Sequence, residues 1–133
     1  MGFFDSFAGR SYDLATDKNW NAIAQPTHLA TILAKSEERL QLIYKHSHRC
    51  SICIMAREEL QKAAKRISNS IDLYFLNVVN QREISDHISS ELGIRHESPQ
   101  VIMMKHGEVI WHGSHWEIQE DKIIAELSDL LKE

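Results

Sequence analysis

The stretch LQLIYKHSHRCSICIMAREEL, residues 40–60, contains the signals that decide the fold. Its first seven residues, LQLIYKH, form an apolar run typical of a buried strand. From Cys50 onward apolar residues recur at helical spacing, which predicts a helix that continues to Ile67. The two cysteines of the chain, Cys50 and Cys53, therefore fall where a strand passes into the first turn of a helix.

The patterns on either side of this stretch predict the remaining elements. Helices are expected at 27–40, at 81–93 with Gly93 as the C-terminal cap, and at 117–133. Strands are expected at 71–79 and as a hairpin within 99–114. The first two strands are joined by a helix, which favours a parallel pair with a right-handed crossover. The whole order predicts an α/β fold of three layers, with a four-stranded mixed sheet flanked by helices.

The chain is expected to form one domain over residues 20–133, preceded by an N-terminal arm at 1–19. The arm has no clear period, and its aromatic residues are expected to pack it onto the domain. These residues are Phe3, Phe4, Phe7 and, at the boundary, Trp20.

Composition excludes several classes of protein. The 133 residues carry a net charge of −4 with histidines neutral, whereas nucleic-acid binding favours a basic balance. No apolar run approaches the roughly 20 residues that span a membrane. The start, MGFFDSFAGR, is too short and too acidic for a secretory signal, so a cytoplasmic location is expected. In that reducing compartment, two close cysteines are more typical of catalysis or metal binding than of a structural disulfide.

The position of the cysteines has a chemical consequence. Unpaired backbone N–H groups and the helix dipole stabilise a thiolate at a helix N-terminus, so the pKa of Cys50 should fall and make it a nucleophile. Cys53 lies within reach of a mixed disulfide formed on Cys50. We expect Cys50 to be the more exposed and Cys53 the more buried thiol. Positive potential should come from the flanking residues Lys45, His46, His48 and Arg49.

Ser98–Pro99 is the second indication of a site. Pro99 directly precedes the first strand of the hairpin, opposite the cysteine loop in the expected topology. We predict that this bond is cis and that it lies close to Cys50. The backbone of Ser98 could then pair with an extended substrate.

Zinc binding is the alternative chemistry for the same residues. His46, His48, Cys50 and Cys53 offer four ligands within eight residues. Structural zinc sites usually combine two separated ligand pairs, and this chain has one cysteine pair. We therefore expect no metal.

At this point the sequence resembles a known family. The motifs KHSHRCSIC, HESPQVIMM and VIWHGSHWEI are similar to those of the bacilliredoxin-like, YtxJ-type family of the bacillithiol system. The resemblance covers the chain from about Trp20 to its end, and it implies a thioredoxin-like fold. It also implies a glutaredoxin-like enzyme that removes bacillithiol from protein mixed disulfides. Cys50 matches the nucleophile of the family, and Ser98–Pro99 matches the cis-proline position of the fold.

The resemblance further implies the partners of the reaction. The protein would bind no cofactor and would use a bacillithiol-like small thiol as co-substrate. Its partners would be thiolated proteins and a dedicated reductase, and no nucleic acid. From their charge alone, and not from the resemblance, Lys45, His48 and Arg49 are expected to help orient the anionic small thiol. One feature departs from the family pattern, because many members have a serine where this chain has Cys53.

Two other functions remain open from the residues alone. One is a general thioredoxin-like disulfide reductase, although the residues Ser51 and Ile52 differ from the glycine and proline usual there. The other is a non-catalytic thioredoxin-fold or metal-binding module, since a fold does not determine function. A comparison of bacillithiol, glutathione and coenzyme A mixed disulfides as substrates would separate these functions.

Overall fold

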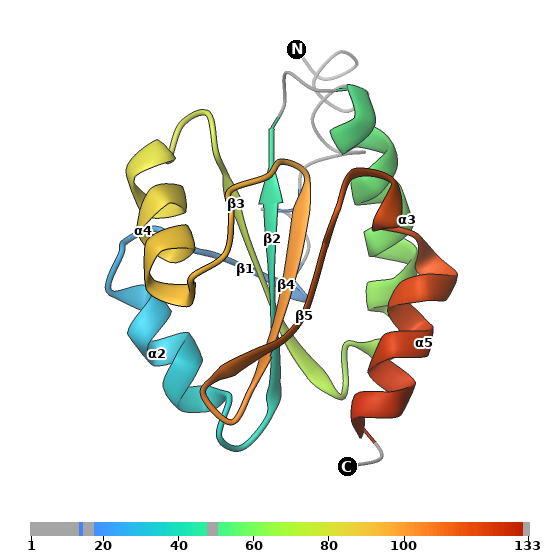
Figure 1. Cartoon of the computed structure of the whole chain (residues 1–133). Coiled ribbons are helices and arrows are strands. Elements are labelled where there is room, and N and C mark those ends of the chain that lie inside the picture. Colours follow the sequence, from blue (N-terminus) through green and yellow to red (C-terminus); the bar gives the residue numbers. More distant parts are fainter. Residues whose placement is uncertain (1–13, 15–17, 48–50, 132–133) are drawn as a thin grey trace.

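The computed structural model describes residues 14, 18–47 and 51–131 (Figure 1). Helices and strands alternate along most of the chain, as expected from the sequence. The helices are α2 (His28–Lys35), α3 (Ser51–Ile67), α4 (Arg82–Leu92), the short 3₁₀ helix η3 (His115–Glu117) and α5 (Glu120–Leu131). The strands are β1 (Trp20–Ala22), β2 (Leu40–His46), β3 (Ile71–Asn77), β4 (Gln100–Lys105) and β5 (Glu108–Ser114).

The sheet has five strands in the order β1-β3-β2-β4-β5. The prediction of four strands was therefore wrong by one, while the mixed pairing was correct. β3 pairs parallel to both β1 and β2, whereas β4 pairs antiparallel to β2 and β5. The central strand, β2, has a partner along each edge, and all seven of its residues are buried.

The additional strand, β1, is too short to be recognised from the sequence. Its three residues, Trp20 to Ala22, pair with Leu73 to Phe75 at the edge of the sheet. Three residues show no alternation that separates a strand from a loop, so tertiary pairing rather than local pattern makes this strand. Trp20 is buried, as expected, and Leu14 of the arm is buried in the same cluster. Phe3, Phe4 and Phe7 lie outside the described residues.

Helices cover both faces of the sheet, which gives three layers (Figure 1). α3 and α5 lie on one face, and α2 and α4 lie on the other. Successive residues of a strand point to opposite faces. Leu42 and Tyr44 of β2 accordingly join the core under α3 and α5, whereas Ile43 joins the core under α2 and α4.

The hairpin of β4 and β5 turns at His106 and Gly107, as the sequence predicted. Both residues have positive φ, 56° and 76°, which is the conformation of a two-residue type I′ turn. The buried Ser36, which follows α2, binds this turn from outside the hairpin. The carbonyl oxygen of Ser36 accepts from His106 N–H at 2.7 Å, and its hydroxyl oxygen accepts from Gly107 N–H at 2.8 Å.

The end of α4 lies where the sequence predicted it, whereas the start of α5 does not. Gly93 adopts the left-handed conformation after α4 with φ of 66°, which confirms the predicted cap. α5 begins at Glu120, three residues later than expected, because η3 occupies the residues before it. In the part of the chain that the structure describes, no helix is both long enough and apolar enough to cross a membrane.

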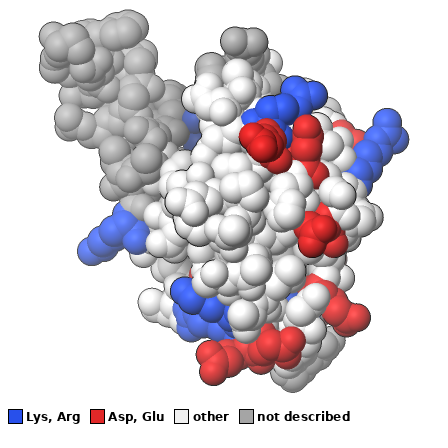
Figure 2. All heavy atoms as spheres, turned by 90° about the vertical axis from the view of Figure 1, so that its left-hand side faces the viewer, with Lys and Arg blue, Asp and Glu red and all other residues white. Residues whose placement is uncertain are grey.

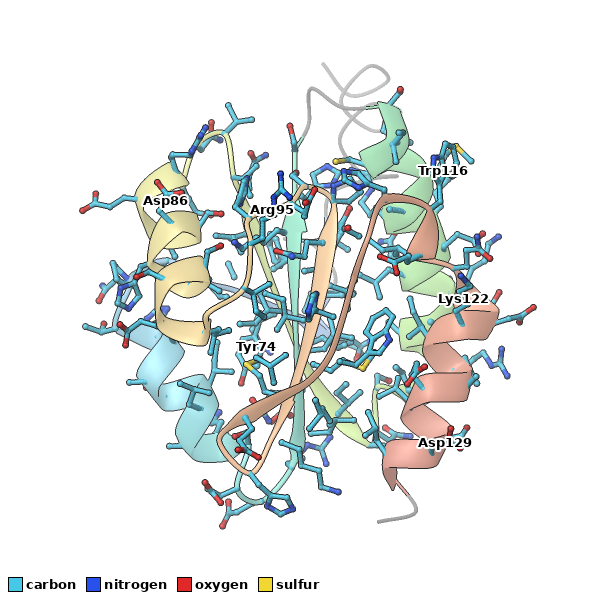
Figure 3. All side chains as sticks on the ribbon, viewed as in Figure 1. Tyr74, Asp86, Arg95, Trp116, Lys122 and Asp129 are labelled. Atoms are coloured by element: carbon cyan, nitrogen blue, oxygen red, sulfur yellow. The ribbon has the colours of Figure 1, made fainter. Side chains whose placement is uncertain are left out.

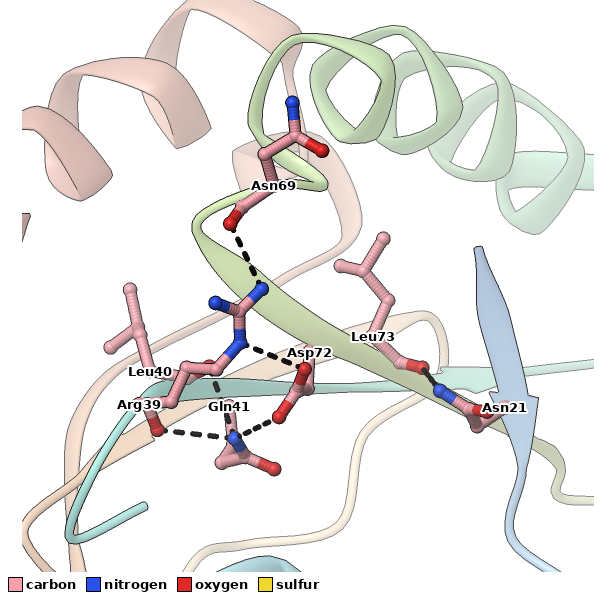
Figure 4. A network of polar contacts seen from close by, with 7 residues as sticks. All are labelled: Asn21, Arg39, Leu40, Gln41, Asn69, Asp72 and Leu73. Carbon is pink, nitrogen blue, oxygen red and sulfur yellow. Dashed lines mark hydrogen bonds and ion pairs between the residues drawn. The ribbon is translucent and has the colours of Figure 1, made fainter. Parts of the chain in front are cut away.

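A polar network joins the first residues of β2 and β3 (Figure 4). Asp72 accepts from Arg39 Nε at 2.9 Å and from Gln41 Nε2 at 2.7 Å. Arg39 also donates to the carbonyl oxygen of Asn69 at 3.0 Å. Gln41 is completely buried, so its amide nitrogen depends on Asp72 and on the carbonyl oxygens of Arg39 and Leu40 instead of water.

We expect Asp72→Ala to lower the free energy of unfolding by about 1–2 kcal/mol, because the buried Gln41 amide loses its charged acceptor. The ion pair with Arg39 adds little, since both side chains are partly exposed. Urea unfolding measures the difference. Asp129→Ala, an exposed position on α5, is the matched control and should stay within about 0.5 kcal/mol of the unchanged protein. Equal losses in both variants would contradict the role given to this network.

Candidate functional site

The cysteine motif lies at the start of α3. Cys53 is the third residue of this helix and is completely buried. That it is more buried than Cys50 stays a prediction. Cys50 immediately precedes Ser51, the first residue of α3, but Cys50 lies outside the described residues, as do His48 and Arg49. The described geometry of the site is therefore that of Cys53 and its neighbours.

Ser98 and Pro99 lie beside Cys53. The Ser98–Pro99 peptide bond is cis, as the sequence predicted. The Cys53 Sγ atom is 3.8 Å from the Ser98 hydroxyl oxygen, a contact in which either group can donate. Residues 45 positions apart in the chain thus meet at the N-terminal end of α3. The predicted approach of Pro99 to Cys50 itself stays a prediction.

A buried polar network lies beneath the first turn of α3. The Tyr44 hydroxyl is 2.8 Å from His46 Nδ1 and 3.2 Å from the carbonyl oxygen of Cys53. His46 Nε2 is 3.1 Å from a terminal nitrogen of Arg57. The Tyr44 ring also packs edge-on against Trp20, with centroids 6.4 Å apart. β2 supplies Tyr44 and His46 from one face, and Arg57 follows Cys53 by one helical turn.

Tyr44 and Arg57 were not among the residues predicted from the sequence. Two signals for them were present. Tyr44 and His46 are two residues apart in a strand, so both point to the face that carries α3. Arg57 is four residues after Cys53, so both lie on the buried side of the helix. A charged residue on an otherwise apolar helix face marks a buried polar contact.

Lys45 lies on the opposite face of the sheet, and this corrects the expectation that it orients an anionic thiol beside the cysteines. Its Nζ atom donates to the carbonyl oxygen of Ser85 at 3.0 Å and to the Ser89 hydroxyl at 2.7 Å, both on α4. The residue is completely buried. Successive side chains of a strand point to opposite faces of the sheet. Tyr44 and His46 point towards α3, so Lys45 between them points towards α4.

Burial has a strong effect on Lys45. It lowers the pKa of the ammonium group to about 8, against the smaller opposing effect of the Asp86 carboxylate. The pKa of the neighbouring His96 is lowered as well, first by burial and then by the charge of Lys45. On the outer surface of this side of the molecule, basic side chains are scattered among acidic ones (Figure 2). Lys45 therefore belongs to the interior beneath α4 and not to a basic surface.

An apolar groove runs beside the cysteine motif, between the first turns of α3 and η3. It has a volume of about 350 Å³ and is lined by Ile52, Met55, Glu58, Trp116 and Ile118 among others. We call it the Met55–Trp116 groove. Trp116 lies beside the N-terminal half of α3 (Figure 3). Met55 and Trp116 are 54% and 61% exposed, unusually high for large apolar side chains.

The groove adjoins the proline loop through the hairpin. The carbonyl oxygen of Pro99 accepts from His115 N–H at 3.1 Å, and His115 is the first residue of η3. Ser114 and Glu117 form a capping box that closes this turn, in which Ser114 N–H donates to the Glu117 carboxylate at 2.9 Å. Cys53, Ser98 and the groove thus share one end of the sheet.

Of the four residues considered as zinc ligands, the structure describes His46 and Cys53, and the contacts of His46 do not favour zinc binding. Both ring nitrogens of His46 are within hydrogen-bond distance of protein groups, Tyr44 and Arg57. A zinc ligand would need one of these nitrogens unprotonated and directed at the metal. No cluster of three or more ligating side chains occurs within 18–47 and 51–131. His48 and Cys50 lie outside those ranges.

The family of the chain follows from comparison with known proteins. Residues 21–123 match the model of the family described as Monothiol bacilliredoxin BrxC. The chain belongs to the monothiol bacilliredoxin family. This bacilliredoxin nevertheless carries two cysteines in its motif, Cys50 and Cys53. The narrower YtxJ-type assignment stays a prediction.

Solved structures show the thioredoxin fold of this bacilliredoxin. A candidate oxidoreductase with a thioredoxin fold is 23% identical with a TM-score of 0.71, covering 80% of this chain and 92% of its own. Trypanosoma brucei brucei thioredoxin is 16% identical with a TM-score of 0.70, covering 89% and 97%. Fasciola hepatica thioredoxin is 16% identical with a TM-score of 0.65, covering 82% and 97%. Family and fold together indicate a thiol redox function for this bacilliredoxin.

The buried Lys45 predicts a measurable pH dependence of stability. In the unfolded chain its amine keeps its proton up to the ordinary pKa of 10.5, whereas the folded protein releases it near pH 8. Between these values the unfolded state binds more protons, so Lys45 makes the free energy of unfolding rise with pH. We expect the free energy of unfolding of the unchanged protein, minus that of Lys45→Met, to increase by about 2 kcal/mol from pH 7.5 to 10.

Urea unfolding at several pH values, with reductant present, tests this expectation. Lys122→Met changes an exposed lysine of α5 and serves as the control, whose difference from the unchanged protein should stay constant with pH. A constant difference for Lys45→Met would show that Lys45 is not desolvated in the folded protein.

Proposed function

We propose that this bacilliredoxin removes a low-molecular-weight thiol, bacillithiol, from protein mixed disulfides by way of Cys50 and Cys53. The observation that carries the proposal is the burial of Cys53 in the first turn of α3, three residues after Cys50 in the sequence and in contact with Ser98. A buried thiol at this position is poorly accessible to a protein disulfide. It can still reach a sulfur atom on Cys50, so it suits a resolving cysteine.

The first step transfers the small thiol. The Cys50 thiolate, favoured by the N-terminal end of α3, attacks the small-thiol sulfur of the mixed disulfide. A new bond forms between Cys50 and the small thiol as the old S–S bond breaks. The thiol of the substrate protein leaves with the electron pair and takes a proton from water.

The second step returns the small thiol to solution. Cys53, as its thiolate, attacks the Cys50 sulfur and forms the Cys50–Cys53 disulfide, while the small thiol leaves and is protonated. The substrate and the small thiol are both reduced, and the enzyme is oxidised by two electrons. A second molecule of small thiol could replace Cys53 in this step, as a monothiol mechanism requires. A thiol reductant or a dedicated reductase must then reduce the enzyme, as expected in a reducing compartment such as the cytoplasm.

The Met55–Trp116 groove would hold the polypeptide part of the substrate. Exposed apolar side chains that gather beside a reactive group are typical of an interaction surface. Glu58 lines this groove, and an anionic small thiol would be disfavoured there. We therefore assign the small thiol to a place outside this groove. The prediction that His48 and Arg49 orient it falls on residues outside the described part of the chain.

The two cysteines should have separate effects on turnover. We expect Cys50→Ser to abolish removal of bacillithiol, because no nucleophile remains for the first step. Cys53→Ser should release the protein thiol at a near-normal rate and keep the small thiol on Cys50 when no second thiol is present. Mass spectrometry after reaction with a bacillithiolated protein distinguishes the two variants.

Activity retained in Cys50→Ser, or an adduct found only on Cys53, would contradict this mechanism. Glutathione and coenzyme A mixed disulfides of the same protein test the identity of the small thiol. Faster reduction of an internal protein disulfide than of any mixed disulfide would favour the general reductase instead.

The groove predicts a difference between large and small substrates. Met55→Ala and Trp116→Ala should lower kcat/KM for a bacillithiolated protein by about fivefold, because each removes apolar contact area from the polypeptide. Neither should change kcat/KM for the symmetrical disulfide of the small thiol by more than about twofold. Ile54→Ala is the matched control, since Ile54 is an exposed apolar residue of the same helical turn outside the groove. If Ile54→Ala lowers kcat/KM for the bacillithiolated protein as much as Met55→Ala does, the groove does not bind the polypeptide part of the substrate.

A further inference from the structure

Three buried contacts link Arg57, His46, Tyr44 and Cys53 in a row, and the donor of each contact can be assigned. Arginine carries only donors and stays protonated in proteins. The 3.1 Å contact between Arg57 and His46 Nε2 therefore requires Nε2 to be an unprotonated acceptor. A histidine that accepts at Nε2 is neutral, and its single proton lies on Nδ1.

The same assignment gives the direction of the next two hydrogen bonds, which lead from His46 to the helix that carries Cys53. His46 Nδ1–H donates to the Tyr44 oxygen at 2.8 Å. The Tyr44 hydroxyl keeps its own proton to donate to the carbonyl oxygen of Cys53 at 3.2 Å. The hydrogen bonds thus run in one direction, from Arg57 through His46 and Tyr44 to the carbonyl oxygen of Cys53. Tyr44 and Cys53 are completely buried, and His46 and Arg57 are less than 10% exposed, so water competes little for these groups.

We propose that Arg57, His46 and Tyr44 are positioning residues for the resolving step, and that Arg57 acts by fixing the tautomer of His46. The inference rests on the proposed function, in which Cys53 attacks the Cys50 mixed disulfide. The Tyr44 hydroxyl bonds the backbone of Cys53 itself. It therefore fixes the height and rotation of the first helical turn, and with them the position of the Cys53 thiol beside Ser98.

Arg57 matters in this arrangement although it does not contact the sulfur. Without its guanidinium, the proton of His46 can move to Nε2, which leaves a lone pair on Nδ1. The Tyr44 hydroxyl can then donate to His46 instead of to Cys53. Loss of Arg57 thus releases the first turn of α3 through two intervening side chains, and loss of the Tyr44 hydroxyl does so directly.

Nitrogen NMR of the His46 ring in the reduced full-length protein tests the tautomer. The unchanged protein should show the Nδ1–H tautomer, and Arg57→Met should shift His46 towards Nε2–H. Arg57→Lys retains a donor for Nε2 and should keep Nδ1–H. Tyr44→Phe should keep it too, because Arg57 still sets the tautomer. Nε2–H in the unchanged protein, or no change in Arg57→Met, would overturn the proposal.

Single-turnover kinetics with a bacillithiolated protein test the resolving step. Release of the protein thiol reports the first step, and release of bacillithiol in the absence of added thiol reports the second. We expect Tyr44→Phe and Arg57→Met to slow the second step about fivefold and the first less than about twofold. Arg57→Lys should restore most of the rate. The control, Arg66→Met, removes an exposed guanidinium from the same helix and should leave both steps unchanged.

The outcomes separate this inference from the function on which it rests. If the unchanged protein transfers no small thiol to Cys50, the proposed function fails, whatever the tautomer of His46. If transfer occurs but Tyr44→Phe resolves at the normal rate, the positioning role alone is overturned. Tyr44→Phe keeps the ring packed between Trp20 and His46. This variant therefore tests the positioning role even when Arg57→Met does not fold.

Discussion

The position of β2 at the centre of the sheet determines the rest of this structure. The strand is paired with β3 along one edge and with β4 along the other, and helices cover both of its faces. Each of its side chains must therefore enter one of two cores. Tyr44 and His46 enter the core under α3, and Lys45 enters the core under α4. A shift of one residue in the pairing would exchange these sets and remove the polar network from beneath Cys53.

Much of the fold followed from the sequence because its signals are local. The apolar runs, the helical spacing after Cys50 and the glycine at the end of α4 each predict one element without reference to the others. Ser98–Pro99 could also be predicted, since proline directly before a strand limits the backbone. The edge strand β1 could not, because three residues form a strand only when Leu73 to Phe75 are beside them. The fold was thus predictable except where pairing alone makes the element.

The candidate site was predicted less completely than the fold. The cysteine motif and the proline were found because chemistry requires those residue types. Lys45 was misplaced because a count of nearby charges ignores the alternation of a strand. Arg57 was missed because its partner, His46, is eleven residues away and belongs to another element. Which buried polar groups meet is decided by packing, and the sequence pattern of one element does not contain that information.

The turn of the β4–β5 hairpin shows how this site depends on distant parts of the chain. Ser36 binds the backbone of His106 and Gly107 at the end of the hairpin that lies far from the cysteines. β4 has six residues, so these bonds lie about 20 Å from Ser98. They resist any sliding of β4 along β2, and such sliding would carry Ser98 away from Cys53. The alignment of Ser98 with Cys53 in the candidate site is thus supported, beyond the pairing of β4 with β2, by a serine at the opposite end of the sheet.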